Sequence, residues 1–169
     1  MKRQPSLRPL SDDHHRALVL ARRLRRDSSG MNTQGLAKLA REVRDEFEAE
    51  LEPHFRVEER WLLSALEDRG AGGLVAQTAE DHARLRGLVR GRWSKDTAHA
   101  LGDLLERHVR FEERVLFPEA EALLSERELA PIRDATLANQ EAAEAVSPSQ
   151  APGAGDSRAR SEEDGTWNS

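Results

Sequence analysis

The sequence predicts an all-α fold, an up-down antiparallel four-helix bundle followed by a disordered C-terminal tail. Composition supports this fold class, because 34% of the 169 residues are charged, 4% are aromatic and none is tyrosine. The helix-favouring residues alanine, leucine, glutamate and arginine predominate. Apolar residues recur at helical spacing in four segments. Short loops separate these segments, which is typical of antiparallel neighbours in one bundle domain.

Each expected helix has its own start or stop signals. The four helices are expected at 11–26, 33–68, 74–93 and 95–124. Ser11 is expected to cap the first helix, residues 27–32 (DSSGMN) form a loop, and the RGAGG segment at 69–73 ends the second helix. Pro53 should kink the second helix or loosen one of its turns, and Pro118 should disturb the fourth helix near its end.

Composition also divides the chain into parts. These are an N-terminal lead at 1–10, the bundle at 11–130, a possible short helix or linker at 131–144 and a disordered tail at 145–169. The SERELAPIRDAT segment is a candidate for a short fifth helix. The tail is rich in proline, glycine, serine and charge and lacks apolar periodicity, which is typical of disorder.

Charge and cysteine content exclude several classes of function. A formal charge of −5 argues against a general nucleic-acid binder, and the basic RRLRRD segment at 22–27 is interpreted as a solvated helix face. The absence of cysteine excludes disulfides, zinc–thiolate sites and thiol catalysis. No stretch approaches the ~18–20 apolar residues that cross a bilayer, and no apolar run follows the basic opening. We therefore expect a cytoplasmic protein without a secretory signal.

A seven-residue phrase occurs twice, as HFRVEER at 54–60 and as HVRFEER at 108–114. In each copy, the histidine and the first glutamate are four residues apart and share one helix face. Apolar neighbours at three-four spacing indicate that both pairs face the interior. These neighbours are Phe47, Leu51, Trp61 and Leu62 for the first copy and Leu101, Leu105, Val115 and Leu116 for the second.

Burying two imidazoles and two carboxylates is costly unless a partner compensates them. Two buried histidine–glutamate hydrogen bonds would be one explanation, but two identical copies favour a common partner, and a bound cation is the simplest. Nitrogen and oxygen ligands without sulfur suit iron, manganese or zinc, and two bridging carboxylates suit a dinuclear centre. Glu59 and Glu113 lie about 100° further around the helix and should face away from the interior.

Two further histidines fit the same interior. His82, in the TAEDHARL segment, has apolar residues three and seven positions later. In the first segment, His14 and His15 compete for the equivalent place. His14 has apolar residues at plus three, four and seven, whereas His15 has Arg22 at plus seven, so the periodicity favours His14. Either histidine alone would be better explained as a partly buried core residue than as a metal ligand.

The segments thus read His, His-xxx-Glu, His, His-xxx-Glu, and in this pattern the sequence resembles the hemerythrin-like (HHE cation-binding) family. Members are four-helix-bundle non-haem di-iron proteins, and the resemblance covers about residues 9–125. It implies two iron ions, with zinc or manganese as alternatives, held by six side chains. The implied terminal ligands are His14, His54, His82 and His108, and the implied bridging carboxylates are Glu58 and Glu112.

Two departures from the oxygen-carrying hemerythrins bear on function. Those proteins have a further histidine four residues before the third-segment ligand, where this chain has Thr78, and they end the last motif with an aspartate at longer spacing, where it has Glu112. The departures imply an open iron position. They favour chemistry with O2, NO or peroxide, or iron handling, over reversible oxygen storage, and the expected function is to bind or sense one of these small ligands.

Other functions and partners remain open at this point. The alternatives are a di-iron enzyme that consumes peroxide or supports iron–sulfur repair, and a helical interaction scaffold with a zinc-filled or vacant site. The expected ligand is a diatomic molecule or peroxide, with neither nucleic acid nor a membrane as partner and with a protein partner left open. Arg86 is expected to be solvated or salt-bridged rather than to attract an anion to the site.

Overall fold

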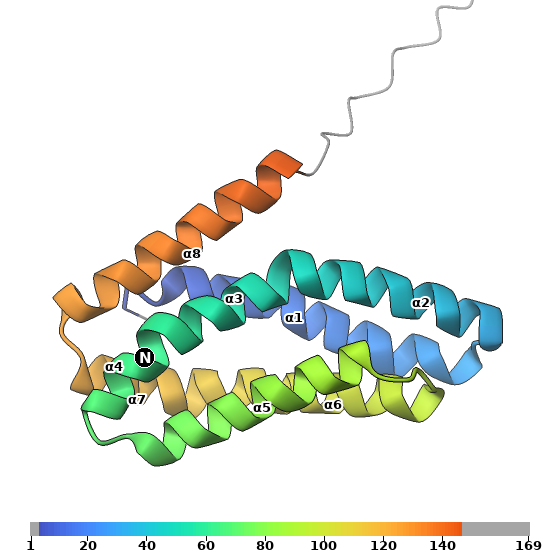
Figure 1. Ribbon diagram of the computed structural model, residues 1–169, viewed down its shortest axis with the longest axis horizontal. Helices are drawn as coiled ribbons and strands as arrows, with labels where there is room; N and C mark the ends of the chain where they lie inside the picture. Colours follow the sequence, from blue (N-terminus) through green and yellow to red (C-terminus); the bar gives the residue numbers. More distant parts are fainter. Residues whose placement is uncertain (1–3, 147–169) are drawn as a thin grey trace, which may run out of the picture.

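The computed structural model describes residues 4–146, which are helical throughout apart from short turns, with no strand among them. Five helical stretches follow one another (Figure 1). The first stretch is α1 (Arg8–Asp27) with the 3-10 turn η1 (Ser28–Gly30). The second stretch consists of α2 (Thr33–Glu46), η2 (Phe47–Leu51), α3 (Glu52–Val57), η3 (Glu58–Leu63) and α4 (Ser64–Asp68). The third stretch is α5 (Gly72–Arg90), and the fourth consists of α6 (Lys95–Phe111), η4 (Glu112–Leu116) and α7 (Phe117–Leu123). The fifth stretch is α8 (Glu126–Val146).

The all-α class is confirmed, but the expected count of four helices is not, because α8 is a fifth. It has 21 residues, longer than the short helix expected in the SERELAPIRDAT segment. Leu129 and Ile132 are fully buried in the core, so α8 is docked by its apolar face. Figure 1 shows α8 lying over α1 and α3, outside the other four stretches. The tail expected from residue 145 lies, from residue 147 onward, outside the described residues.

Local hydrogen bonds and backbone conformation account for several of the helix ends. The side chain of Asn32 accepts a hydrogen bond from the backbone of α2, and Ser94 does the same for α6. Gly70, with φ of 81°, ends the second stretch in a conformation that favours glycine. The prediction that Ser11 caps the first helix is wrong. The helix begins earlier, with Pro9 in its first turn, where the missing N–H costs nothing.

Three segments, η2, η3 and η4, widen from α-helical to π-helical winding. Two of them, η2 and η4, directly precede the turns that contain Pro53 and Pro118. Because a proline ring cannot donate a backbone hydrogen bond, a wider turn accommodates it, and the loosened turns expected from these prolines are confirmed. The segments η3 and η4 begin at Glu58 and Glu112, at the same place in the repeated phrase. Such π-helical turns are frequent at functional sites.

The core consists of two apolar clusters with polar residues between them. On α1, Leu10 belongs to one cluster and Ala17 to the other, and His14 lies between the two. The stretch that ends in α7 shows the same arrangement in the opposite direction, with Val109 in the cluster of Ala17 and Leu116 in the cluster of Leu10. The polar layer is therefore enclosed at both ends by apolar packing.

Two residues expected on the inward face are instead largely exposed. Trp61 is 38% exposed and Val115 is 44% exposed. Both lie in π-helical segments, where the wider winding turns them outward, while the adjacent Leu62 and Leu116 are fully buried. No helix in the described part of the chain is long and apolar enough to span a membrane.

Candidate metal centre

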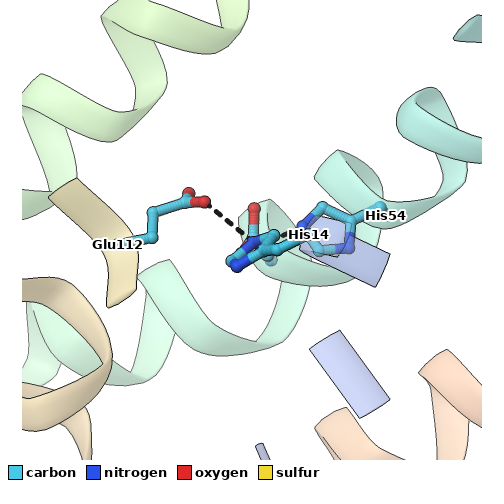
Figure 2. Close-up of side chains that lie close together, drawn as sticks. His14, His54 and Glu112 are labelled. Carbon is cyan, nitrogen blue, oxygen red and sulfur yellow. Dashed lines mark ion pairs between the residues drawn. The ribbon is translucent and has the colours of Figure 1, made fainter. Parts of the chain in front are cut away.

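All six side chains singled out from the sequence meet in the polar layer. They come from the four stretches that surround the interior, and each is at most 4% exposed. Figure 2 shows Glu112 reaching toward His14, with His54 beside it. The contributing elements are α1 for His14, α3 for His54, η3 for Glu58, α5 for His82, α6 for His108 and η4 for Glu112. His15, the alternative to His14, is exposed.

Glu58 faces histidines from two different helices. Its Oε1 lies 3.4 Å from Nε2 of His54, on its own stretch, and its Oε2 lies 3.3 Å from Nε2 of His82 on α5. The four-residue spacing of the repeated phrase sets the first contact, and the packing of α5 against the second stretch sets the other. One carboxylate thus connects two histidines across the interior.

Glu112 is the equivalent residue of the second copy. Its Oε1 lies 3.1 Å from Nε2 of His108, and its Oε2 lies 3.2 Å from Nε2 of His14 on α1. Oε1 also lies 3.8 Å from Nε2 of His82. The two copies therefore place their carboxylates in the same way, each between a histidine of its own helix and a histidine of a neighbour.

The donor atoms form two overlapping groups, each suited to holding a cation. Within each group, the ligand atoms all lie within 4.8 Å of one another. Glu58 and Glu112 belong to both groups. The first group is His14, His54, Glu58 and Glu112, and the second is Glu58, His82, His108 and Glu112.

These inward-facing atoms are buried without hydrogen-bond partners. They are the four histidine Nε2 atoms and both carboxylate oxygens of Glu58 and Glu112. Although several of them lie 3.1–3.4 Å apart, their directions do not meet hydrogen-bond geometry. Native proteins leave few buried polar atoms unpaired. Eight such atoms in one layer fit a cation, because all of them can be metal ligands.

The expectation that Glu59 and Glu113 face away from the interior residues is wrong. Nδ1 of His82 donates to Oε1 of Glu59 at 2.9 Å, and Nδ1 of His14 donates to Oε1 of Glu113 at 2.7 Å. A turn of about 100° carries each glutamate from the interior to the interface with the next helix, rather than to solvent. These hydrogen bonds place a proton on Nδ1 and orient each ring so that Nε2 faces inward.

A second kind of outer carboxylate was not predicted from the sequence. Oδ2 of Asp13 lies 3.2 Å from Nδ1 of His54, and Gln140 of α8 donates to Oδ1 of Asp13 at 2.8 Å. Asp81 is the equivalent residue on α5, but its Oδ2 lies 3.9 Å from Nδ1 of His108. The signal was present, because an Asp-His dipeptide occurs in both segments. What the dipeptide does not reveal is that each aspartate faces a histidine of another helix and that only Asp13 is within hydrogen-bond distance of it.

The carboxylates of the polar layer favour protonation of the histidines beside them. Burial disfavours protonation of His54, but the negative charge of Glu58 prevails and the pKa of His54 is raised to about 10. Burial likewise opposes protonation of His82, and the carboxylates around it, Glu112 first, raise its pKa to about 11. The hydrogen bond from His82 lowers the pKa of Glu59 to about 2. The layer therefore favours anionic carboxylates that need cationic partners.

Ion pairs extend this network on one side. Nη1 of Arg86 lies 2.6 Å from Oε1 of Glu59, and its Nε lies 2.8 Å from Oε2 of Glu52, a largely buried carboxylate. The guanidinium lies over the ring of Phe55, and Phe55 stacks on His82 with ring centroids 3.9 Å apart. The interpretation of Arg86 as a salt-bridged residue is confirmed.

Two cavities reach the layer. A void of about 10 Å³ lies beside His14, His54, His108 and Glu112. Its apolar wall is formed by Ala17, Leu51, Phe55, Leu105 and Val109. A larger cleft of about 400 Å³ is lined by residues of α1, η2, α3 and α8. Asp13 and His54 line both, so this pair stands between the cleft and the void.

An all-helical chain with four histidines and two carboxylates buried in this way belongs to the class of helical proteins built to bind cations. The family model described as hemerythrin HHE cation binding domain matches residues 7–92, about half of the chain. The protein is therefore a member of this hemerythrin family, and membership implies cation binding, typically of iron. The match includes three of the four histidines and Glu58, whereas His108 and Glu112 lie beyond it. Searches of curated proteins and of solved structures gave no match.

Proposed function

We propose that the chain is a cytoplasmic non-haem di-iron protein that binds or senses O2, NO or peroxide. The four histidines would be terminal ligands, and Glu58 and Glu112 would be shared by the two ions. The observation that carries this proposal is that two donor groups share both glutamates, with the inward atoms lacking hydrogen-bond partners. Iron is favoured by family membership, while zinc and manganese accept the same ligand types.

When bound, the iron would supply redox chemistry and a coordination position for a small ligand. The residue at the place of the additional histidine supports an open position. Thr78 is fully buried one turn before His82, and its hydroxyl donates to the carbonyl oxygen of Leu74 at 3.0 Å. It offers no nitrogen ligand and its hydroxyl is already bonded to the backbone.

The size of the void supports a diatomic ligand or peroxide. About 10 Å³ is close to the smallest volume that holds one water molecule, so a larger substrate would not fit without movement of the wall. The wall is apolar on the side of Leu51, Phe55 and Leu105. These side chains exclude bulk water, while the outer carboxylates orient the histidine rings.

A di-iron enzyme that consumes peroxide or supports iron–sulfur repair is the second candidate. The observation in its favour is the cleft that extends to His54, because turnover requires repeated exchange of substrate and product with solvent. A helical interaction scaffold with a zinc-filled or vacant site is disfavoured by the number of buried polar atoms that lack partners.

The test is metal analysis and optical spectroscopy of the full chain expressed in iron-rich medium. We expect two iron ions per chain and a change of the optical spectrum on addition of O2 or NO. A His54→Ala variant should lose iron, whereas His15→Ala, which changes an exposed histidine, should keep it. Peroxide turnover would favour the enzyme over the sensor. A chain without iron that holds zinc or no metal would refute the di-iron proposal and favour the scaffold.

A further inference from the structure

The four histidines are not supported equally from outside. In the ligand pair of His14 and His54, both Nδ1 atoms contact a carboxylate oxygen, at 2.7 Å and 3.2 Å. In the pair of His82 and His108, only His82 has such a bond, and Nδ1 of His108 is buried without a hydrogen-bond partner. Because outer carboxylates orient ligating histidines and make them more basic, the two pairs should differ in metal affinity.

The difference originates at two equivalent aspartates. Asp13 directly precedes His14 and contacts His54, while Asp81 directly precedes His82 and lies 3.9 Å from His108. Both aspartate side chains are largely buried, with 12% and 16% exposed, so solvent access does not distinguish them. The two aspartates differ in their distance from the histidine Nδ1 atom, and only Asp13 is close enough to orient its histidine, His54.

Donors from two other residues hold Asp13 in place. Gln140 donates from Nε2 to Oδ1 of Asp13 at 2.8 Å, and Arg16 donates from Nη2 to the same oxygen at 2.7 Å. With Oδ1 occupied in this way, Oδ2 is directed to His54. Within the described residues, Asp81 has no hydrogen bond of this kind, and its contact with His108 is its one ion pair.

Gln140 belongs to α8, which lies outside the stretch that matches the family. Its amide also donates to the carbonyl oxygen of Pro9 at 3.3 Å, and the adjacent Asn139 donates to the carbonyl oxygen of Pro53 at 3.2 Å. The side chain of Gln140 therefore links α8 to Asp13, while the hydrogen bond of Asn139 is to the backbone of α3. This arrangement supplies both a candidate residue and its control.

We propose that Gln140 is a positioning residue that acts through Asp13 on His54, and that it makes the metal position of His14 and His54 the tighter of two. The inference rests on the proposed di-metal function. It assigns the fifth helix a role at the centre. A chain that keeps the six ligands but lacks Gln140 should fill its two positions with more similar affinities.

The test compares two pairs of matched variants in the full chain. Gln140→Leu removes the donor to Asp13, and Asn139→Leu makes the same change one residue earlier without touching the aspartate. Asp13→Asn removes the charge beside His54, and Asp81→Asn removes the charge that stands 3.9 Å from His108. Ferrous iron is added anaerobically at buffered free concentrations, and iron per chain and the melting temperature of the metal-free chain are measured.

We expect the parent to bind iron in two steps. At a free iron concentration where the parent holds one ion, Asp13→Asn and Gln140→Leu should lose most of it, because loss of an outer partner weakens affinity about 10–100-fold. Asp81→Asn and Asn139→Leu should keep it. Equal melting temperatures of the two metal-free leucine variants would assign the loss to positioning rather than to folding.

Two results would overturn the inference while leaving the di-iron proposal intact. One is equal weakening by Asp81→Asn and Asp13→Asn, and the other is a Gln140→Leu isotherm identical to that of the parent. A parent chain that binds no iron at any concentration would instead refute the di-iron proposal itself, and the inference with it.

Discussion

Replacement of Glu112 by glutamine tests whether one carboxylate serves two cations. Glu112 is fully buried and belongs to both donor groups. Glutamine keeps the shape of the side chain but has one acceptor oxygen instead of two and carries no charge. If both groups hold a cation, Glu112→Gln should weaken both positions at once. Glu119→Gln changes an exposed glutamate on α7 of the same stretch and is the matched control.

The magnitude follows from linkage between binding and folding. A cation present at a thousandfold excess over its dissociation constant stabilises the folded chain by about 4 kcal/mol. For a chain of this length, 1 kcal/mol corresponds to roughly 2–4 °C in melting temperature, so each bound iron ion should raise the melting temperature of the parent by roughly 8–16 °C. Glu119→Gln should show the same rise, and Glu112→Gln little or none.

Differential scanning calorimetry with and without ferrous iron, together with iron per chain, provides the measurement. Because each protein is compared with itself, any effect of the substitution on the metal-free fold cancels. A full iron-dependent rise in Glu112→Gln, with two ions per chain, would show that this carboxylate is not a shared ligand.

Three further predictions concern packing and the open position. Gly102→Ala should destabilise the chain by about 1–3 kcal/mol in urea unfolding, because the new Cβ would lie 2.8 Å from the carbonyl oxygen of Ala21. The control Gly87→Ala meets no atom within 4 Å and should be neutral or stabilising. Equal effects of the two substitutions would contradict the close approach of α1 and α6. Phe55→Ala should lower the free energy of unfolding by about 3–5 kcal/mol and should also lower iron per chain, because Phe55 stacks on His82. Phe47 is equally buried, so Phe47→Ala should lower the free energy of unfolding by a similar amount but keep the iron. Thr78→His should add a nitrogen ligand and slow the reaction of the iron-loaded chain with hydrogen peroxide, and unchanged kinetics and spectrum would place residue 78 away from the metal.

The inner residues of the site could be predicted because their geometry is local. Residues four apart on a helix share a face whatever the rest of the fold is, so the repeated phrase defines the pairs His54–Glu58 and His108–Glu112. The choice of His14 over His15 followed from the same periodicity, and the exposure of His15 agrees with it. The all-helical class followed from composition for a similar reason, since helix propensity is a local property.

The outer residues could not be predicted in the same way, because their partners lie on other helices. Helix geometry places Glu59 about 100° around the axis from Glu58, but whether that direction leads to solvent or to a neighbouring helix depends on helix packing. In the fold, it meets His82. The fifth helix is longer than the sequence predicted, because it continues through Pro131, and burial of Leu129 and Ile132 against the core stabilises the helix around that proline.

The repeated phrase produces an inner layer that is nearly twofold symmetric and an outer layer that is not. On the side of His54, the partner carboxylate is held by Gln140 and lines a solvent-open cleft. On the side of His82, the partner Glu59 is instead held by Arg86, whose guanidinium covers Phe55. A symmetric set of ligands would by itself give two equal metal positions. If the layer holds two cations, the outer contacts would leave one position beside the cleft and close the other with ion pairs, so a small ligand arriving through the cleft would meet the His54 side first.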